Sequence, residues 1–281
     1  MVNNFLVSTG FVLILILALI VVICFVIYAI ISSINEKYFT FINEHSKAIK
    51  ILNEINDSYS FFTISDTILK NSYDNSYYYD NISCEDYLTY YLAYNKKDVS
   101  ITINNIYENK RNYKRYVDEI NERCILNRFD ISTENYKEQK LKTFEKIAFN
   151  KKIKKPVLDY LIYVDLKLTN INGAYLSHKS NNFRIDEIRS IIKKLNQKMD
   201  GYYLDYDTWQ AISRVERGKV TNRMRFAIYE RDHYRCRKCG RRTQDLEIDH
   251  IIPIAKGGKT TYNNLQTLCH ECNAKKGANI E

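Results

Sequence analysis

Two Cys-x-x-Cys pairs near the C-terminal end constrain the fold more than any other feature of this sequence. The first pair is Cys236 and Cys239, and the second is Cys269 and Cys272. Each pair can form a tight knuckle, so that four thiolates surround one tetrahedral ion. The spacing therefore predicts a closed structural zinc site made by these four cysteines. Because four protein ligands leave no vacant position on the zinc, any chemistry must come from residues between or beside the pairs.

Polar residues occupy those positions. Asp249-His250 lies between the pairs, Asn264 precedes the second pair, and Asn273 directly follows the last cysteine. Hydrolysis of a phosphodiester needs a base to deprotonate water and a cation to neutralise charge on the phosphate. Histidine has an unperturbed pKa of about 6.5, so most of it is neutral and basic near neutral pH. His250 is therefore the candidate general base.

These residues belong to a longer ordered pattern, which consists of Arg231-Asp-His-Tyr-Arg-Cys236, Asp249-His250, Asn264-Leu265 and Cys269-x-x-Cys272-Asn273-x-x-Lys276-Gly277. The pattern resembles HNH endonucleases of the ββα-metal type that carry a four-cysteine zinc, and the resemblance covers residues 221–279. It implies that His250 is the general base and that Asn264 fixes the loop that orients it. It also implies that Asp249 and Asn273 hold a catalytic divalent ion. Since Asn273 replaces the histidine of the family name, the protein ligands are oxygens, which favours Mg²⁺ or Mn²⁺.

The local fold of this part follows from the same residues. If residues 246–250 form a strand, Asp249 and His250 point to opposite faces, so a bend must follow before both can act on one phosphate. Pro253 and the glycine pair after it supply irregular backbone for that bend. We expect residues 264–274 to form a helix that returns the asparagine of the ion site to Asp249. The predicted module is a strand, a loop, a strand and a helix, closed by zinc.

Positive charge is concentrated on the same module. The chain has a net charge of +9, and residues 214–281 hold 15 Lys and Arg against 8 Asp and Glu. Such a surface is expected of a module that binds the DNA backbone. Lys275 and Lys276 are candidate phosphate contacts because they would share a helix with the predicted ion ligand. Arg235 and Arg237 are further candidates beside the first cysteine pair, where a solvated charged face is the alternative interpretation.

The first thirty-five residues carry the second clear signal. Residues 11–31 contain no charged side chain, and as a helix they would span about 30 Å, the thickness of a bilayer core. A cleaved signal peptide is the alternative, but the run is long and lacks a basic start and an obvious cleavage site. Residues 1–10 have no Lys or Arg, whereas Lys37, Lys47 and Lys50 follow the run. We therefore expect a single-pass protein of the cell membrane with its C-terminal domain in the cytoplasm.

The middle of the chain is predicted to be mostly helical. A stripe of apolar residues in 35–55 indicates a helix that continues from the membrane, and it could pair with a second copy as a short coiled coil. We expect a loop with a short helix at 85–94 in the tyrosine-rich stretch 57–97, where stacking of tyrosines on unpaired bases is the weaker functional alternative. Helices are expected at 101–127 and 132–150, the second capped by Ser132 or Thr133.

A small α+β unit is predicted before the cysteine module. Residues 159–168 and 174–178 would form a hairpin around a turn at 170–173, followed by a helix at 183–197. Residues 200–213 would be a connector, and Thr221 would cap a helix at 222–231. The fold class is therefore α+β. The predicted domains are an anchor, a helical middle region, the small unit with its connector, and the HNH domain, at 1–34, 35–155, 156–212 and 213–281.

Two classes of function agree with these features. The first is a membrane-anchored, metal-dependent endonuclease that cleaves DNA at the inner face of a membrane, for example in defence against incoming foreign DNA. The second is a zinc-stabilised nucleic-acid-binding adaptor without catalysis. An adaptor has no need of Asp249, His250 and the two asparagines together, so the enzyme is favoured. A nuclease that faces outward and degrades environmental DNA would require the opposite topology.

Overall fold

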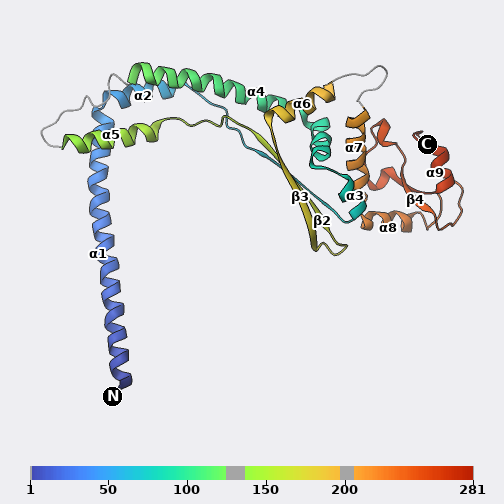
Figure 1. Cartoon of the computed structure of the whole chain (residues 1–281), viewed down its shortest axis with the longest axis horizontal. Coiled ribbons are helices and arrows are strands. Elements are labelled where there is room, and N and C mark those ends of the chain that lie inside the picture. Colours follow the sequence, from blue (N-terminus) through green and yellow to red (C-terminus); the bar gives the residue numbers. More distant parts are fainter. Residues whose placement is uncertain (1, 125–136, 197–205, 281) are drawn as a thin grey trace. The chain divides into compact units, whose positions relative to one another are not determined.

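The computed structural model describes residues 2–124, 137–196 and 206–280, with side chains from Leu17 onward (Figure 1). The chain divides into two compact units. One unit comprises residues 1–62 and 108–156, and the other comprises residues 63–107 and 157–281. We describe each unit by itself. The predicted domain boundaries stay predictions.

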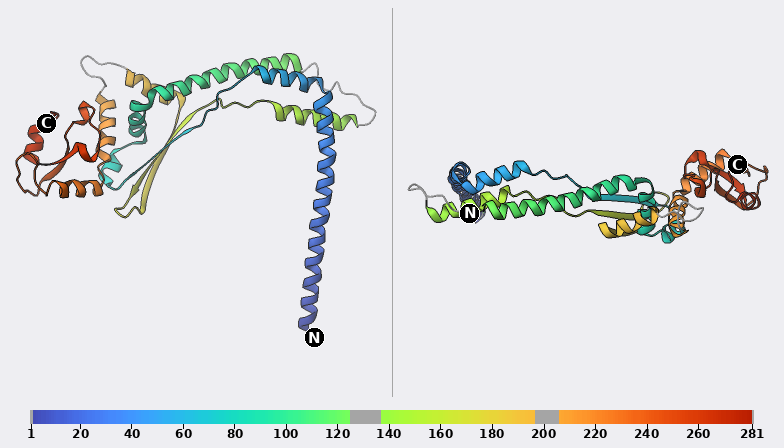
Figure 2. Two further views of the ribbon diagram at one scale, coloured as in Figure 1. Left: turned by 180° about the vertical axis from the view of Figure 1, so that it is seen from behind. Right: turned by 90° about the horizontal axis from the view of Figure 1, so that it is seen from above.

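The first unit is helical. It contains α1 (Val2–His45), α2 (Lys47–Ser58), the second part of α4 (Cys84–Cys124) and α5 (Glu138–Lys152). Helix α5 lies against both α1 and α2, as the two views of Figure 2 show. The predicted helix at 35–55 is interrupted at Ser46, whose hydroxyl oxygen accepts a hydrogen bond from Ile49 N (3.2 Å) and so caps α2. The hydroxyl also donates to Glu145 Oε1 at 2.5 Å.

The apolar stripe of residues 35–55 is buried inside this unit. Ile42, Ile49, Leu52 and Ile55 are fully buried and share a core with side chains of α4 and α5. Because the same chain already covers this stripe, it does not provide the exposed seam that a coiled coil with a second copy requires. The suggestion of homo-oligomerisation through this helix therefore loses its structural basis.

Helix α1 is long and apolar enough to cross a membrane. The segment Leu17–His45 has a mean hydropathy of 3.0 over its most apolar window, and none of that window is buried. A core helix of a soluble protein would be mostly buried, whereas a signal sequence would pass the same test of length and composition. The structure thus contains one N-terminal helix that is long and apolar enough to span a membrane, and the span itself stays a prediction.

The second unit is built on a three-stranded sheet in the order β1-β2-β3. Strands β2 (Leu161–Thr169) and β3 (Tyr175–Arg184) form an antiparallel hairpin. The predicted hairpin is therefore confirmed, with a longer second strand. Strand β1 (Thr67–Tyr73) pairs with β2 in parallel. Residues 57–97 were predicted to form a loop with one helix, and that prediction is wrong for β1.

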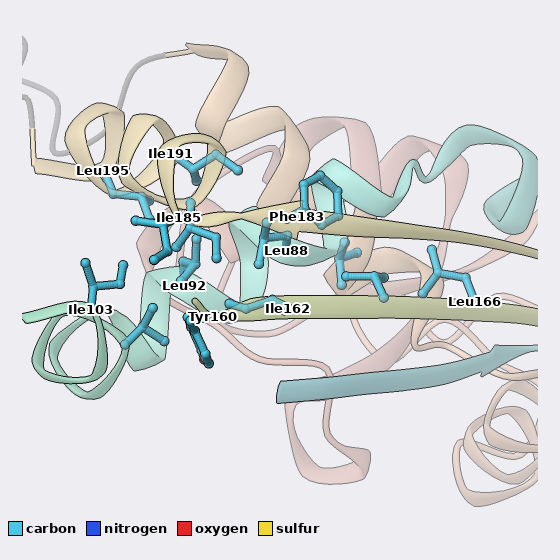
Figure 3. Close-up of a cluster of buried hydrophobic side chains, with 14 of the residues drawn as sticks. Leu88, Leu92, Ile103, Tyr160, Ile162, Leu166, Phe183, Ile185, Ile191 and Leu195 are labelled. Atoms are coloured by element: carbon cyan, nitrogen blue, oxygen red, sulfur yellow. The ribbon is translucent and has the colours of Figure 1, made fainter. Parts of the chain in front are cut away.

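Helices cover the sheet and close its core. They are α3 (Ser76–Asn81), the first part of α4, α6 (Ile185–Asn196) and α7 (Tyr206–Gly218). Side chains from α4, β2, β3 and α6 point toward one another in Figure 3, among them Leu88, Leu92, Ile162, Phe183 and Ile191. The α6 helix matches the helix expected at 183–197 and contributes Ile185, Ile188, Ile191 and Leu195 to this core.

Three helix predictions need correction. The helices expected at 85–94 and 101–127 fall within one continuous helix, α4, of 41 residues, except for residues 125–127, which lie outside the described residues. Helix α5 begins at Glu138, after the predicted start, and the proposed caps Ser132 and Thr133 lie outside the described residues. The expected connector at 200–213 is helical from Tyr206, where α7 begins. Thr208, Ala211, Ile212 and Val215 are buried on α7, so tertiary packing explains this helix.

The C-terminal module follows α7. Thr221 caps α8 (Asn222–Arg231), as predicted, by accepting a hydrogen bond from Met224 N at 3.1 Å. Strands β4 (Leu246–His250) and β5 (Leu265–Cys269) are antiparallel, and α9 (His270–Lys276) lies against both (Figure 1). The order of strand, loop, strand and helix is confirmed. The helix expected at 264–274 is wrong over residues 265–269, which pair with β4, and α9 begins only after them.

Candidate functional site

The four predicted zinc ligands come together. The sulfur atoms of Cys236, Cys239, Cys269 and Cys272 all lie within 4.8 Å of one another. The Sγ atoms of Cys239 and Cys269 are 3.9 Å apart. A tetrahedral zinc with bonds of about 2.3 Å would separate its sulfurs by about 3.8 Å. The donor set and its spacing therefore fit a zinc ion.

Backbone geometry holds the first knuckle. Gly240 N donates to Cys236 O at 2.8 Å, and Cys236 N donates to Arg241 O at 3.0 Å. Gly240 has a φ of 73°, a left-handed conformation that glycine adopts without strain. Arg237 N donates to Thr267 O at 2.9 Å, which joins this knuckle to β5. The knuckle before β4 and the one after β5 are thereby brought to the same end of the hairpin.

Folding shifts the pKa values of two of the thiols in opposite directions. Hydrogen bonds from the backbone and side chain of Arg241 lower the pKa of Cys239 to about 6, so this thiol readily supplies a thiolate. Burial, followed by hydrogen bonds with the other three cysteines, raises the pKa of Cys272 to about 12. This opposite shift is expected where four thiols share one small volume, because four thiolates repel one another without a positive ion between them.

A partly buried ion pair attaches the end of α8 to the same hairpin. The Asp232 carboxylate accepts from Arg231 Nε (2.8 Å), from Arg231 Nη2 (2.9 Å) and from Thr267 N (2.8 Å). Arg231 also donates to the carbonyl oxygens of Tyr262 (2.8 Å) and Leu265 (2.7 Å). Charge-assisted, two-point contacts of this kind fix geometry as well as add stability. The end of α8 is therefore held firmly against β5 before the chain enters the first knuckle.

His250 stands at the end of β4 with an exposed fraction of 9 %. Its Nε2 lies 2.8 Å from Thr260 Oγ1, and Lys276 Nζ donates to its carbonyl oxygen at 2.8 Å. Burial lowers the pKa of His250, although Asp249 and Glu216 oppose this effect. A lowered pKa keeps the imidazole neutral near pH 7, the form that a general base requires.

The loop between β4 and β5 is closed by Asn264. Its Oδ1 accepts from Ile252 N (2.9 Å), and its Nδ2 donates to Ile252 O (3.1 Å) and Lys259 O (2.9 Å). Gly258 is also required here, because a Cβ atom at this position would lie 1.8 Å from Ile252 O. Asn264 thus connects both ends of the loop that follows His250. That this loop in turn orients His250 stays a prediction.

Asp249 is directed toward α9. Its Oδ2 accepts from Gln266 Nε2 at 3.2 Å and lies 3.0 Å from Lys276 Nζ. The Lys276 side chain is fully buried, and its ammonium is shared by Asp249 and the His250 carbonyl. Sequence analysis placed Lys276 on the DNA-binding surface. In the structure it lies inside the module and supports the predicted site residues, so we do not retain it among the DNA contacts.

Asn273 meets the same strand two residues earlier. Its Nδ2 donates to Glu247 Oε2, and Glu247 Oε1 lies 2.8 Å from His270 Nδ1. Glu247 and Asp249 share one face of β4 because side chains alternate along a strand. The structure therefore directs Asp249, Glu247 and Asn273 to the side of β4 that α9 covers. Carboxylate and amide oxygens are the ligands that Mg²⁺ or Mn²⁺ prefers. In the structure, however, Asp249 Oδ2 contacts Lys276 and Gln266, and Asn273 directs its Nδ2 toward Glu247, so an ion site made by Asp249 and Asn273 stays a prediction.

The other predicted DNA contacts lie on the surface. Arg235, Arg237 and Lys275 are exposed. Lys275 pairs with Glu271 at 2.6 Å, and Glu271 also binds Arg241. The two arginines are less engaged, since Arg235 makes only a long contact of 3.3 Å with Gly240 O. Exposed guanidinium groups next to the knuckle are well suited to phosphate contacts.

The comparison with known proteins places this module in a family. Residues 236–279 match the family model described as HNH endonuclease. No curated protein matches the chain, and no solved structure does. A β-hairpin followed by a short helix, with four cysteines whose spacing fits a zinc ion, is the ββα arrangement expected of this family. The match identifies this C-terminal part of the chain as an HNH domain, in agreement with the resemblance seen in the sequence.

Three residues near the site were missed by sequence analysis. Glu247 could have been found, because its position two residues before Asp249 puts both carboxylates on one strand face. Glu216 and Thr260 had no such signal. They meet across 44 residues of chain, and only the folded structure brings them together.

Proposed function

We propose that this protein is an endonuclease that hydrolyses DNA phosphodiester bonds with the help of a divalent metal ion. The match of residues 236–279 to the HNH endonuclease family carries the proposal. The geometry supports it, because a neutral, buried imidazole follows directly after a carboxylate on β4. The cysteine cluster would hold a structural zinc and take no part in the reaction.

Each polar residue of the module has a role in this proposal. His250 accepts the proton of the attacking water at its free ring nitrogen. Asp249 and Asn273 would hold Mg²⁺ or Mn²⁺, which supplies charge neutralisation at the phosphate and the leaving oxygen when bound. Asn264 keeps the loop closed, and Lys276 fixes the end of β4 through the His250 carbonyl. The exposed Arg235, Arg237 and Lys275 would contact the phosphate backbone.

Cleavage of plasmid DNA by the full chain tests this function. We expect nicking that depends on Mg²⁺ or Mn²⁺ and is lost in His250→Ala, while the protein still binds zinc and remains folded. His178→Ala is a matched control, because His178 is an exposed histidine on β3. If His250→Ala cleaves as fast as the wild type, the assignment of the base is wrong. If the wild type binds DNA but does not cleave it with either metal, the module is an adaptor.

The apolar part of α1 motivates a further proposal about location. We propose that residues 11–31 anchor the chain in the cell membrane, with the HNH domain on the cytoplasmic side, where it could act on foreign DNA as it enters. Protease accessibility of the C-terminal module in intact cells tests the topology, because a cytoplasmic module is protected until the cells are opened. If the protease digests the module in intact cells, the module faces outward and the proposed orientation is wrong.

The defence role requires a separate experiment. A phage challenge would compare cells that make the full chain with cells that make a chain lacking residues 1–34. We expect protection from the full chain, weaker protection from the truncated chain, and none from His250→Ala in the full chain. Equal protection by the full and truncated chains would remove the anchor from the mechanism.

A further inference from the structure

The hydroxyl of Thr260 determines which nitrogen of His250 is free. Thr260 Oγ1 donates to the backbone carbonyl of Glu216 at 2.6 Å. A hydroxyl has one proton, so the same oxygen can only accept from His250 Nε2, which lies 2.8 Å away. The imidazole must then carry its proton on Nε2. Its Nδ1 is left as the acceptor, which is the state that a base needs.

Thr260 is in turn held by the side chain of Glu216. Glu216 Oε2 accepts from Thr260 N at 2.8 Å. The carbonyl and the carboxylate of Glu216 therefore bind the hydroxyl and the backbone N–H of Thr260, respectively. The Glu216 side chain is fully buried on α7. Glu216 lies outside residues 236–279, the part that matches the HNH family. A residue that precedes the matched segment therefore supports the proposed base.

The other oxygen of the Glu216 carboxylate binds residues that lie outside the matched segment 236–279. Oε1 accepts from Tyr90 OH at 2.8 Å and from Lys219 Nζ at 3.0 Å. Burial alone would raise the pKa of Glu216, but the hydrogen bonds from Thr260, Tyr90 and Lys219 outweigh it and lower the pKa. Glu216 is therefore a charged carboxylate with partners on both oxygens. Such a fully satisfied buried network fixes one geometry.

Additional contacts hold α7 and α8 against the region around β1 and α3. Asn222 N donates to Asp74 Oδ2 at 2.8 Å, and Arg225 donates to Tyr78 OH at 3.0 Å. Gly218 ends α7 so close to Ile82 that a Cβ atom would lie 2.6 Å from its Cδ1. The tyrosine-rich stretch that gave no clear function in the sequence thus provides the surface on which the start of the C-terminal module docks.

We propose that Thr260 and Glu216 are positioning residues for His250, and that docking of Glu216 on Tyr90 completes the nuclease site. The inference rests on the proposed nuclease function and adds the source of the base's orientation. On this basis helix α7, which precedes the matched residues 236–279, is a structural part of the site. The HNH domain would not hold its base in the active tautomer without α4 and α7.

The tautomer can be measured without any cleavage assay. The full chain, labelled with ¹⁵N at histidine and held in detergent micelles, would be studied by NMR at about pH 8, where imidazole is neutral. The His250 signals are assigned by their loss in His250→Ala. We expect the wild type to show a protonated Nε2 and an unprotonated Nδ1, and Thr260→Val to show an averaged pair. Rapid averaging in the wild type, or protonation at Nδ1, overturns the proposal.

Cleavage kinetics then test the consequence. Thr260→Val should lower kcat by about 10- to 100-fold with little change in KM, because a mispositioned base affects proton transfer rather than DNA binding. Thr260→Ser keeps a hydroxyl and should restore most of the rate. Thr261→Val is the matched control, since the neighbouring Thr261 is exposed. Tyr90→Phe removes one donor to Glu216 and should lower kcat by a smaller factor.

These measurements separate the two hypotheses. If the wild type cleaves and Thr260→Val cleaves equally well with an unchanged fold, the positioning role is wrong and the nuclease function stands. If the wild type does not cleave, the nuclease function fails, whereas the NMR measurement still decides whether Thr260 fixes the imidazole. An equal fall in kcat for Thr260→Val and Thr260→Ser would also contradict the proposal, because a lost hydroxyl could not then be the cause.

Discussion

Removal of zinc should unfold the HNH domain and leave the sheet of the same unit intact. The cysteine cluster is packed against few apolar side chains, chiefly Leu246 and Leu268. Full burial of a leucine contributes about 1.5–3 kcal/mol, so the fully buried Leu268 and the partly buried Leu246 together supply less than about 6 kcal/mol. A structural zinc contributes about 10–16 kcal/mol at neutral pH. The metal therefore contributes more than the apolar side chains around the cysteines, so the two knuckles and the cysteine end of β4 and β5 should lose their structure without it, although Leu265 and Ile248 also pack against α8.

Hydrogen exchange on the full chain measures this directly. We expect one zinc per chain, and after removal by a chelator the amides of β4 and β5 should lose protection while those of β1 to β3 keep it. Cys239→Ser should reproduce the loss, because this ligand is exposed and its replacement changes little else. Cys84→Ser is the matched control, as Cys84 lies on α4 and outside the cluster.

The opposite result would refute the reasoning. If β4 and β5 keep full protection in a chain shown to be free of zinc, then packing and the Asp232 ion pair are sufficient to hold the domain. The cysteine cluster would in that case have no structural role. Zinc bound with normal stoichiometry by Cys239→Ser would equally contradict the assignment of that ligand.

Three further predictions follow from charged groups. Folding lowers the pKa of Glu216, so the charged carboxylate stabilises the folded protein above its unfolded pKa of about 4.3, and this contribution is lost as pH falls toward the folded value. The difference in unfolding temperature between wild type and Glu216→Gln should therefore shrink below about pH 4. Lys276→Met should destabilise the domain by about 3–5 kcal/mol, since it leaves Asp249 without its buried partner, whereas Lys275→Met should change the free energy of unfolding by less than about 1 kcal/mol; chemical denaturation measures both. Arg237→Ala should weaken DNA binding and reduce the slope of log affinity against log salt by about 1, and an unchanged slope would remove Arg237 from the phosphate contacts.

The C-terminal module could be predicted from sequence because its determinants are local. The two cysteine pairs close a hairpin and a short helix, and each expected element lies within a few residues of the ligand that it carries. Thr221 and the turn at 170–173 were likewise found by rules that depend on neighbouring residues. The one local error was at residues 265–269, where strand pairing with β4 prevailed over the expected helix.

Features that depend on distant residues were not accessible in this way. Strand β1 has a polar, half-exposed sequence and becomes a strand only by pairing with β2, far along the chain. Helix α7 packs its buried face against α3 and the core around it, whereas the sequence predicts a connector there. Lys276 carries a charge that normally indicates a surface position, yet its ammonium is satisfied by Asp249 and the His250 carbonyl.

Dependence on distant contacts also explains why the sequence indicated the wrong role for Lys276 and gave no sign of Glu216. Both side chains are charged and buried, and no periodic pattern marks a charged residue as buried. Their partners lie on other elements, so only the folded chain shows how each charge is neutralised. The family pattern predicts Asp249, His250, Asn264 and Asn273 as site residues, but it contains no sign of Glu216 or Thr260.

The pairing of β1 with β2 has a consequence for the order of events during translation. A ribosome releases the chain from its N-terminal end, so β1 must wait for its partner until residues 161–169 have emerged. The HNH segment is made later still, and Glu216 can meet Tyr90 only after α7 has been released. We therefore expect the candidate site around His250 to form last in a nascent chain, long after the apolar helix α1 has been released.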